Sequence, residues 1–129
     1  MKYMLLTYLE EKAWLALSPE QQQAEMDSCA PLIRQLLAEK KVLAGAPLQP
    51  TATATTVRYR GGKRLLVDGP FAETREQLAG YTILECKNLD EAIAIASGIL
   101  GTSTLASLEV RPIVDTTSQS DVPPVPSRS

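Results

Sequence analysis

The chain has 129 residues, of which 44% are hydrophobic and 22% are charged, and its formal net charge is -2. This length and composition suit one globular domain, and the weak negative charge disfavours a nucleic-acid or anionic-membrane partner. The sequence contains no histidine, which excludes Ser-His and Cys-His nucleophile pairs and imidazole metal sites. We expect no cofactor and no metal, and the lack of a signal-like N-terminus or a membrane-length apolar run predicts a cytoplasmic protein.

The first part of the chain predicts a strand followed by a helix. Residues Tyr3–Leu9 form a short apolar and aromatic run, which is typical of a strand buried on both faces. An ambiguous stretch follows and is expected to pin Trp14 to the core. Ser18 then begins a capping box for a helix that runs towards Lys41, and Pro31 predicts a kink or a break into two helices. The apolar stripe of this helix comprises Met26, Cys29, Ile33, Leu36 and Leu37.

A second strand is predicted over residues 42–48, and a hairpin follows it. The strand-like residues 54–60 and 63–68 flank Gly61-Gly62, a two-residue loop suited to positive φ. Pairing outward from this turn places a basic, solvated tip at one end and apolar side chains at the base. We expect Asp68 to lie at the buried end of one face, near Thr55.

The second half of the chain repeats the order of strand, helix and strand. Strands are expected at residues 78–85 and 105–113, and Asn88 begins a capping box for the helix between them. The stripe of this helix comprises Leu89, Ile93, Ala96 and Leu100. From residue 115 the sequence is rich in Thr, Ser and Pro, so residues 1–114 are expected to form the domain and 115–129 a flexible tail.

Two strand-helix-strand units with an added hairpin predict an α+β fold, namely a ferredoxin-like sandwich with an antiparallel sheet. Its helices would cover one face of the sheet only. The apolar first strand argues against a fully solvated opposite face, and self-association through that face is the simplest solution. We therefore expect a homodimer whose two sheets face each other and enclose a cleft.

Several stretches of the chain resemble one known family. They are MKYMLL (1–6), TATTVR (53–58), DGPFAET (68–74), EQLAGY (76–81) and EVRPI (109–113). These stretches resemble the YCII-related proteins, in the branch marked by an Asp-Gly-Pro-Phe signature, and the resemblance extends over about residues 1–113. It implies a dimeric α/β barrel built on the ferredoxin-like fold.

The resemblance also bears on activity. Most members of this branch have no established activity, and some resemble accessory proteins encoded beside extracytoplasmic-function sigma factors. More distant relatives include a dehydrochlorinase of aromatic breakdown, and a His-Asp pair has been proposed as catalytic in the wider family. Because this chain has no histidine, no such role is carried over to it.

Asp68 is the main candidate for a catalytic residue. It could serve as a general base or ligand anchor at the edge of the cleft, or it could cap its own turn by accepting backbone amide hydrogen bonds. Phe71, in the same signature, could wall a ligand pocket or pack under the turn. Cys29 and Cys86 have no metal-like spacing and are expected to be buried free thiols rather than a disulfide.

Three further residues are candidates for ligand binding. Arg111 and Glu109 share one strand face, where the guanidinium could clamp a carboxylate or phosphate, or the two could form an ion pair. Tyr81 could contact a ligand or pack in the core or the dimer interface.

Two functional hypotheses follow from these residues. The leading one is a protein that binds a small anionic or aromatic metabolite in the dimer cleft, with lyase-like or hydrolase-like chemistry at Asp68. The alternative is a non-enzymatic dimeric accessory or regulatory protein, associated with sigma-factor-linked transcription, whose cleft residues only hold the dimer together.

Overall fold

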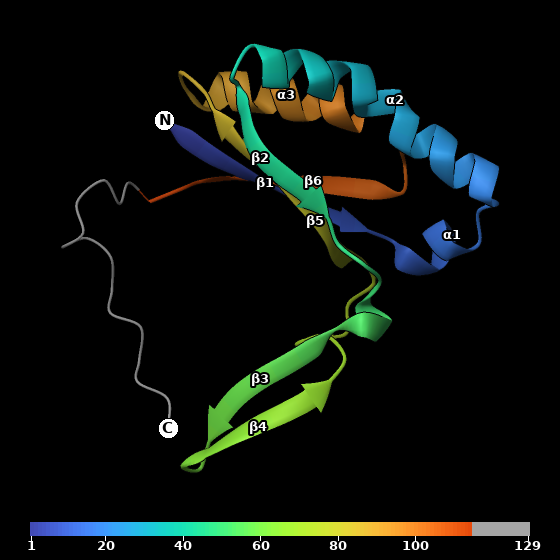
Figure 1. Cartoon of the computed structure of the whole chain (residues 1–129), viewed down its shortest axis with the longest axis vertical. Coiled ribbons are helices and arrows are strands. Elements are labelled where there is room, and N and C mark those ends of the chain that lie inside the picture. The colour runs from blue at the N-terminus through green and yellow to red at the C-terminus, as the bar shows by residue number, and fades with distance from the viewer. Residues whose placement is uncertain (115–129) are drawn as a thin grey trace.

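The computed structural model describes residues 1–114; residues 115–129, where the tail is predicted, lie outside the described part. The described chain contains six strands, three α-helices and one 3-10 helix (Figure 1). In chain order they are β1 (Lys2–Leu9), α1 (Glu11–Leu15), α2 (Pro19–Ala38), β2 (Val42–Pro47), η1 (Thr51–Thr53), β3 (Thr55–Arg60), β4 (Lys63–Asp68), β5 (Gln77–Glu85), α3 (Leu89–Leu100) and β6 (Ala106–Pro112).

Four strands form one antiparallel sheet in the order β2-β5-β1-β6. The units β1-α2-β2 and β5-α3-β6 therefore interleave within a single sheet. This arrangement is the ferredoxin-like α+β fold that the sequence predicts. Helices α2 and α3 lie on the same face of the sheet, and neither covers the opposite face (Figure 1). We call the opposite face, which carries Met4, Leu6 and Tyr8 of β1, the open face.

The hydrophobic core lies between the sheet and the C-terminal part of α2 together with α3. Leu5 of β1 and Leu84 of β5 are the most deeply buried large side chains, with 1% and 0% exposure. The other core residues are Tyr3, Leu36, Val42, Cys86, Ala92, Ile95 and Ala96. The stripe predicted for α3 is partly wrong, since Leu89 and Ile93 are exposed and the helix instead packs through small residues that allow close approach.

Strand β1 is buried on one face only. Tyr3 and Leu5 point to the helices and are buried, whereas Met4, Leu6 and Tyr8 alternate with them and are half-buried on the open face. The predicted burial of the second face is not met within the described chain, and its covering by another copy stays a prediction. The strand itself was predicted correctly, but the apolar character of its residues does not reveal what covers each face of the sheet.

Helix α2 is one continuous element. Ser18 Oγ accepts from the Gln21 amide at 3.1 Å and Gln21 Oε1 accepts from the Ser18 amide at 2.9 Å, so the predicted capping box is present. Pro31 lies inside the helix without breaking it, and the alternative of two helices is wrong. Neither this helix nor another described one combines the length and apolar character needed to cross a membrane.

The hairpin β3–β4 forms a sheet of its own, separate from the main one (Figure 1). Gly61 and Gly62 take positive φ angles of 59° and 75° at the turn, and the predicted register is confirmed, with Thr55 opposite Asp68. Every residue of β4 is exposed. The expectation that Asp68 lies at a buried end is therefore wrong, because the base of the hairpin does not pack onto the main sheet.

Two smaller expectations have mixed outcomes. Trp14 lies in the short helix α1 and is half-buried, so it does not join the core cluster. Cys29 and Cys86 are both free thiols, as predicted. Only Cys86 is buried, whereas Cys29 is half-buried on α2.

Candidate functional site

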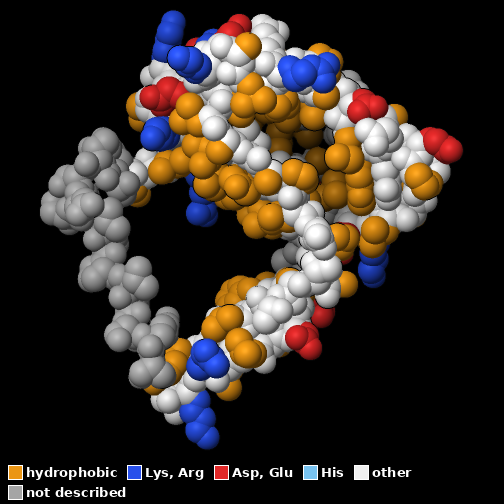
Figure 2. Space-filling model, viewed as in Figure 1, with side chains coloured by type: hydrophobic (Ala, Val, Ile, Leu, Met, Phe, Trp, Pro, Cys, Tyr) orange, Lys and Arg blue, Asp and Glu red, His pale blue; other side chains and the backbone are white. Residues whose placement is uncertain are grey.

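A pocket of about 590 Å³ lies between α2 and the helix-covered face of the sheet. Leu36, near the C-terminal end of α2, is buried against the sheet, but Met26 in the N-terminal half of the helix remains 52% exposed. The space under this half of the helix is the pocket. The space-filling view shows the surface hollowed there between hydrophobic side chains (Figure 2).

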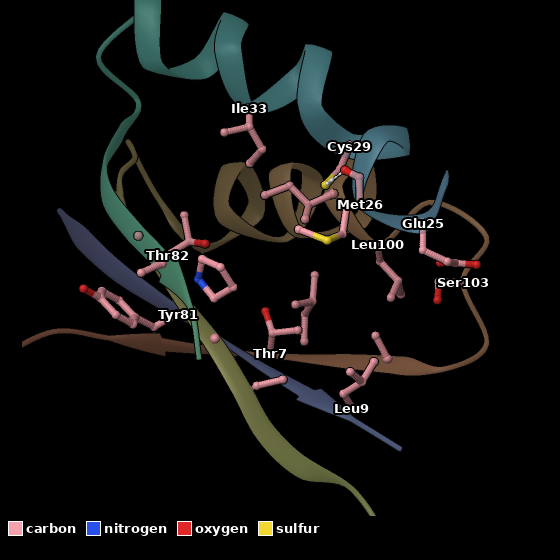
Figure 3. A pocket seen from close by; sticks show the side chains of 18 of the residues that line it. Thr7, Leu9, Glu25, Met26, Cys29, Ile33, Tyr81, Thr82, Leu100 and Ser103 are labelled. Atoms are coloured by element: carbon pink, nitrogen blue, oxygen red, sulfur yellow. Dashed lines mark hydrogen bonds between the residues drawn. The ribbon is translucent and has the colours of Figure 1, made fainter. Parts of the chain in front are cut away.

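Both helices, the sheet and the adjoining loops contribute to the lining. Met26, Cys29 and Ile33 project from α2 into the space above the sheet, where Thr7 of β1 and Thr82 of β5 lie (Figure 3). The other lining residues are Leu9, Trp14, Glu25, Ser28, Leu37, Val42, Ala44, Gly45, Ala46, Pro47, Leu48, Ala79, Gly80, Tyr81, Ile99, Leu100, Ser103, Leu105, Ala106 and Leu108.

Small residues on β2 and β5 explain why the space is not filled. Gly45 of β2 lies opposite Thr82 of β5, Pro47 lies opposite Gly80, and Ala44, Ala46 and Ala79 are further small residues of the lining. At Gly45 an added Cβ would lie 2.8 Å from the carbonyl oxygen of the neighbouring strand, so this close approach requires glycine. The sheet therefore offers few bulky side chains opposite the apolar stripe of α2, and a void remains.

The pocket is chemically apolar with a few hydrogen-bonding groups. The Thr7 and Thr82 hydroxyls can donate and accept, and the Cys29 thiol, which donates to the Met26 carbonyl at 3.6 Å, is a weak donor. Among the described residues that line the pocket, none is lysine or arginine, and Glu25 is the charged one. Such a lining suits an uncharged molecule and offers an anion no partner.

The described residues do not suggest a metal centre. Within residues 1–114, no group of three or more His, Cys, Asp and Glu side chains is placed to hold a metal ion. The pocket lining contains a single carboxylate and a single thiol, Glu25 and Cys29.

Asp68, the predicted catalytic residue, lies outside this pocket. Its carboxylate is exposed at the end of β4 and forms no hydrogen bond or ion pair with another described side chain or amide. The following turn is closed by other groups: the Gly69 amide donates to the Ala54 carbonyl at 2.7 Å, and Thr56 Oγ1 donates to the Gly69 carbonyl at 2.9 Å. Asp68 is thus available to solvent rather than held in a site.

Phe71 is 73% exposed, so it does not pack under the turn. The Arg58 guanidinium lies 5.2 Å from the centre of its ring, a cation–π contact worth about 0.5–1 kcal/mol at an exposed position. This contact fastens the Asp-Gly-Pro-Phe turn to the side of the hairpin. Phe71 therefore belongs to the hairpin surface and not to the pocket lining.

Arg111, Glu109 and Tyr8 form a polar cluster on the open face. Arg111 Nε lies 3.0 Å from Glu109 Oε2, and the Tyr8 hydroxyl donates to Glu109 Oε1 at 3.1 Å. The hydrogen bond to Glu109 raises the pKa of Tyr8, with smaller contributions from burial and from the Glu109 charge. The ion pair that the sequence allowed is therefore present, and the guanidinium is already engaged by a carboxylate.

Tyr81 lies beside this cluster. It pairs with Leu6, which also pairs with Glu109 on the other side of β1, so Tyr81 and Glu109 flank Leu6 on the open face. The Tyr81 side chain points away from Met26 and Cys29 (Figure 3), although its strand borders the pocket. The structure thus brings Tyr81, Glu109 and Arg111 to one face.

The hairpin residues lie elsewhere. The connections to the hairpin leave the sheet near Leu9 and Ala106, and Arg111 lies five residues further along β6, roughly 17 Å at the rise of a strand. Asp68 and Phe71 are thus not gathered with the open-face residues within the described chain.

The pocket itself is what the sequence analysis missed. Its upper wall, Met26, Cys29 and Ile33, was predicted as a core stripe. The sequence did contain a signal of the pocket. Residues 44–46 and 79–80 are all small, so these parts of the sheet cannot fill the space opposite the large side chains of the α2 stripe.

Comparisons with known proteins show the family of this chain. The family model described as the YCII-related domain matches residues 1–117. This chain belongs to the YCII-related family. An uncharacterised protein of Rhizobium meliloti (strain 1021) is 36% identical to it over 114 residues, which cover 88% of this chain and 92% of the relative.

One solved structure is also similar to this YCII-family chain. It is the 5-chloro-2-hydroxyhydroquinone dehydrochlorinase from Burkholderia phenoliruptrix AC1100, in complex with 2,5-dihydroxybenzoquinone. The identity is 14%, the coverage is 88% of this chain and 94% of that chain, and the TM-score is 0.48. The narrower assignment of the chain to the Asp-Gly-Pro-Phe branch stays a prediction.

Proposed function

We propose that this YCII-family protein binds a small, uncharged molecule of aromatic or otherwise apolar character in the pocket beneath α2. The observation that carries the proposal is a pocket of about 590 Å³, lined mainly by apolar side chains and reached by the Thr7 and Thr82 hydroxyls. Pockets of roughly 300–1,000 Å³ with a few convergent polar groups are typical of small-molecule sites.

The lining narrows the class of ligand. An anion placed here would lose its hydration without meeting a lysine or arginine among the described lining residues, and Glu25 would repel it. A ring or short apolar chain with one or two hydroxyl or carbonyl groups would find threonine hydroxyls and thiol and thioether sulfur. We therefore keep the aromatic part of the sequence-based hypothesis and place the ligand under α2 rather than in a dimer cleft.

The proposal is one of binding. Asp68 does not line the pocket, so lyase-like or hydrolase-like chemistry at this carboxylate stays a separate hypothesis with a separate site. Replacing Asp68 distinguishes the two, because the Asp68→Ala variant should bind a pocket ligand as the wild type does. Loss of binding in this variant would place the ligand at the hairpin and overturn the proposal.

A thermal-unfolding screen tests the proposal with matched ligands. Benzyl alcohol and benzamide are compared with benzoate, which is similar in size but anionic, and the screen then extends to neutral phenols and quinones. A ligand at about a hundred times its dissociation constant should stabilise the fold by about 2.7 kcal/mol. We expect neutral compounds to raise Tm and the benzoate-like compounds to leave it unchanged.

Two variants on the same helix provide the control. Cys29→Phe places an aromatic ring in the pocket and should abolish the ligand-induced shift. Gln35→Phe introduces the same side chain at an exposed position of α2 outside the lining and should leave the shift intact. Equal responses of both variants, or stabilisation by anions only, would contradict the proposed site.

The alternative function, a dimeric accessory protein, is favoured by a different observation. On the open face the groups that could hold a ligand are engaged with one another, since Glu109 accepts from both Tyr8 and Arg111. This is the pairing expected if these residues help to hold two copies together. Measurements of self-association test this alternative.

A further inference from the structure

The β3–β4 hairpin has no described partner that explains its stability. It forms an independent two-stranded sheet, and it extends away from the main sheet (Figure 1). Such a hairpin is only marginally stable in water unless it packs against another element. Its turn, register and Arg58–Phe71 contact are nevertheless well defined.

Both faces of the hairpin present exposed apolar side chains. Val57 and Leu66 are directly opposite each other in the register, and each is 62% exposed. Leu65 and Val67 point to the other face and are also exposed, and Phe71 lies at the base. Exposed apolar side chains gathered on a small two-stranded element mark a contact with another molecule.

The open face of the main sheet is a surface of matching character. Met4 and Leu6 of β1 and Ile83 of β5 are half-buried there, with no described helix above them. In the space-filling view, hydrophobic side chains cover the hairpin and also the body of the molecule across from it (Figure 2). A single chain therefore carries two apolar surfaces that are not used within its described part.

The charges of the two parts are complementary. Residues 55–68 carry four cations, Arg58, Arg60, Lys63 and Arg64, and one carboxylate, Asp68. The remainder of the sequence carries nine cations and fourteen carboxylates. A basic hairpin would therefore be attracted to the acidic body of another copy of the same chain.

We propose that two copies of this chain exchange hairpins, each β3–β4 hairpin lying across the open sheet face of the other copy. A two-fold dimer satisfies both surfaces at once, because the same pair of patches meets twice. This goes beyond the dimer predicted from the sequence, in which only the sheets meet. It is also independent of the proposed ligand pocket, which lies on the helix-covered face.

Sedimentation velocity on the full chain and on two double variants tests the exchange. Val57→Asp/Leu66→Asp places charges in the centre of the hairpin patch and should weaken the dimer by about a hundredfold or more, since central interface residues dominate affinity. Leu89→Asp/Ile93→Asp makes the same changes at exposed positions of α3 and should leave the dimer intact. A monomeric wild type, or a hairpin variant that still dimerises, would overturn the proposal.

Cross-linking gives a readout that does not depend on the variants folding. Unlabelled and nitrogen-15-labelled wild-type chains are mixed, and a carbodiimide joins the Lys63 amine to nearby carboxylates. We expect cross-links from Lys63 to body carboxylates in mixed-isotope form, because the hairpin and the body that it contacts belong to different copies. Such cross-links found only within single chains would mean that the hairpin folds back on its own body and would exclude the exchange.

Discussion

The main sheet and the β3–β4 hairpin are made of similar strands but differ in what covers them. Leu5 in β1 is 1% exposed, whereas Leu66 in β4 is 62% exposed, although both lie in apolar runs with strong strand character. Turn chemistry and alternation are sufficient to form a strand pair. Burial is added by helices tethered to the sheet, and the hairpin has no such helix.

A second contrast lies within the helix-covered face itself. Where α3 meets α2, Gly98 allows an approach so close that an added Cβ would lie 2.9 Å from Leu32 Cδ2, and the core is closed. Under the N-terminal half of α2 the small residues belong to the sheet, and they leave a pocket. Small side chains therefore have opposite effects in the two regions. Between α2 and α3 they let the helices pack closely, whereas in the sheet they leave a pocket because the N-terminal half of α2 does not pack against them.

The largest expected effect compares one substitution in the two regions. Leu84→Ala removes a fully buried side chain and should destabilise the fold by about 2–5 kcal/mol. Leu66→Ala should change the stability of the monomer by less than about 0.5 kcal/mol, as expected for an exposed position. Urea unfolding of both variants at low protein concentration measures these values.

Protein concentration then sharpens the comparison. If hairpins are exchanged, the cost of Leu66→Ala should grow as the concentration rises into the range where the wild type dimerises, while the cost of Leu84→Ala should stay large throughout. A large cost for Leu66→Ala at all concentrations would show that the residue is buried within a single chain.

Much of the fold could be predicted because local signals and global topology agree. Ser18 and Gln21 form the capping box, the positive φ of Gly61 and Gly62 sets the hairpin register, and the alternation in β6 sends Leu108 and Val110 towards the core. Two strand-helix-strand units then leave few possible sheet orders. The fold class followed from features that each involve only a few neighbouring residues.

The features that sequence reasoning missed depend on how elements sit against one another. The periodicity of α3 permits more than one stripe. The predicted Ala96 is buried, but its buried neighbours are Ala92 and Ile95 rather than Leu89 and Ile93, because small residues let the helix approach the sheet. The exposure of Asp68 depends on the direction in which the whole hairpin leaves the sheet. Neither property is encoded in a local pattern. The pocket likewise depends on the sizes of side chains in α2 and in the sheet, which are far apart in the sequence.

An effect of intermediate size is expected from the two cysteines, since Cys86 lies in the packed core and Cys29 lines the pocket. Burial raises the pKa of the Cys86 thiol, so less of it is thiolate near neutral pH, and its side chain is 4% exposed. Cys29 lines the open pocket. We expect iodoacetamide to modify Cys29 faster than Cys86 by about tenfold or more, because Cys86 must wait for local opening.

A pocket ligand makes this test specific. A bound neutral aromatic compound should slow the alkylation of Cys29 while the rate at Cys86 follows only the change in overall stability, and peptide mass spectrometry separates the two sites. Equal protection of both thiols would indicate general stabilisation and not occupation of the pocket.

The smallest expected effect concerns Tyr8 on the open face. The Glu109 hydrogen bond is the main cause of its raised pKa, so folding favours the neutral phenol. The resulting stabilisation is fully present below the usual tyrosine pKa of about 10 and is lost as the pH rises through the higher folded value. Glu109→Gln should lower the pKa of Tyr8, and Arg111→Gln should raise it, because the guanidinium lowers it in the wild type.

Ring-proton NMR resolves the titration of Tyr8 from that of the other tyrosines and connects it to the hairpin. A hairpin docked over the open face would change both the burial of Tyr8, which raises its pKa, and the positive charge near it, which lowers its pKa, so separating the copies with Val57→Asp/Leu66→Asp should shift this pKa relative to the dimer. A pKa of Tyr8 that is the same in both association states would mean that the partner's hairpin does not cover this part of the sheet. The pH titration thus locates the hairpin on the open face, which sedimentation alone does not do.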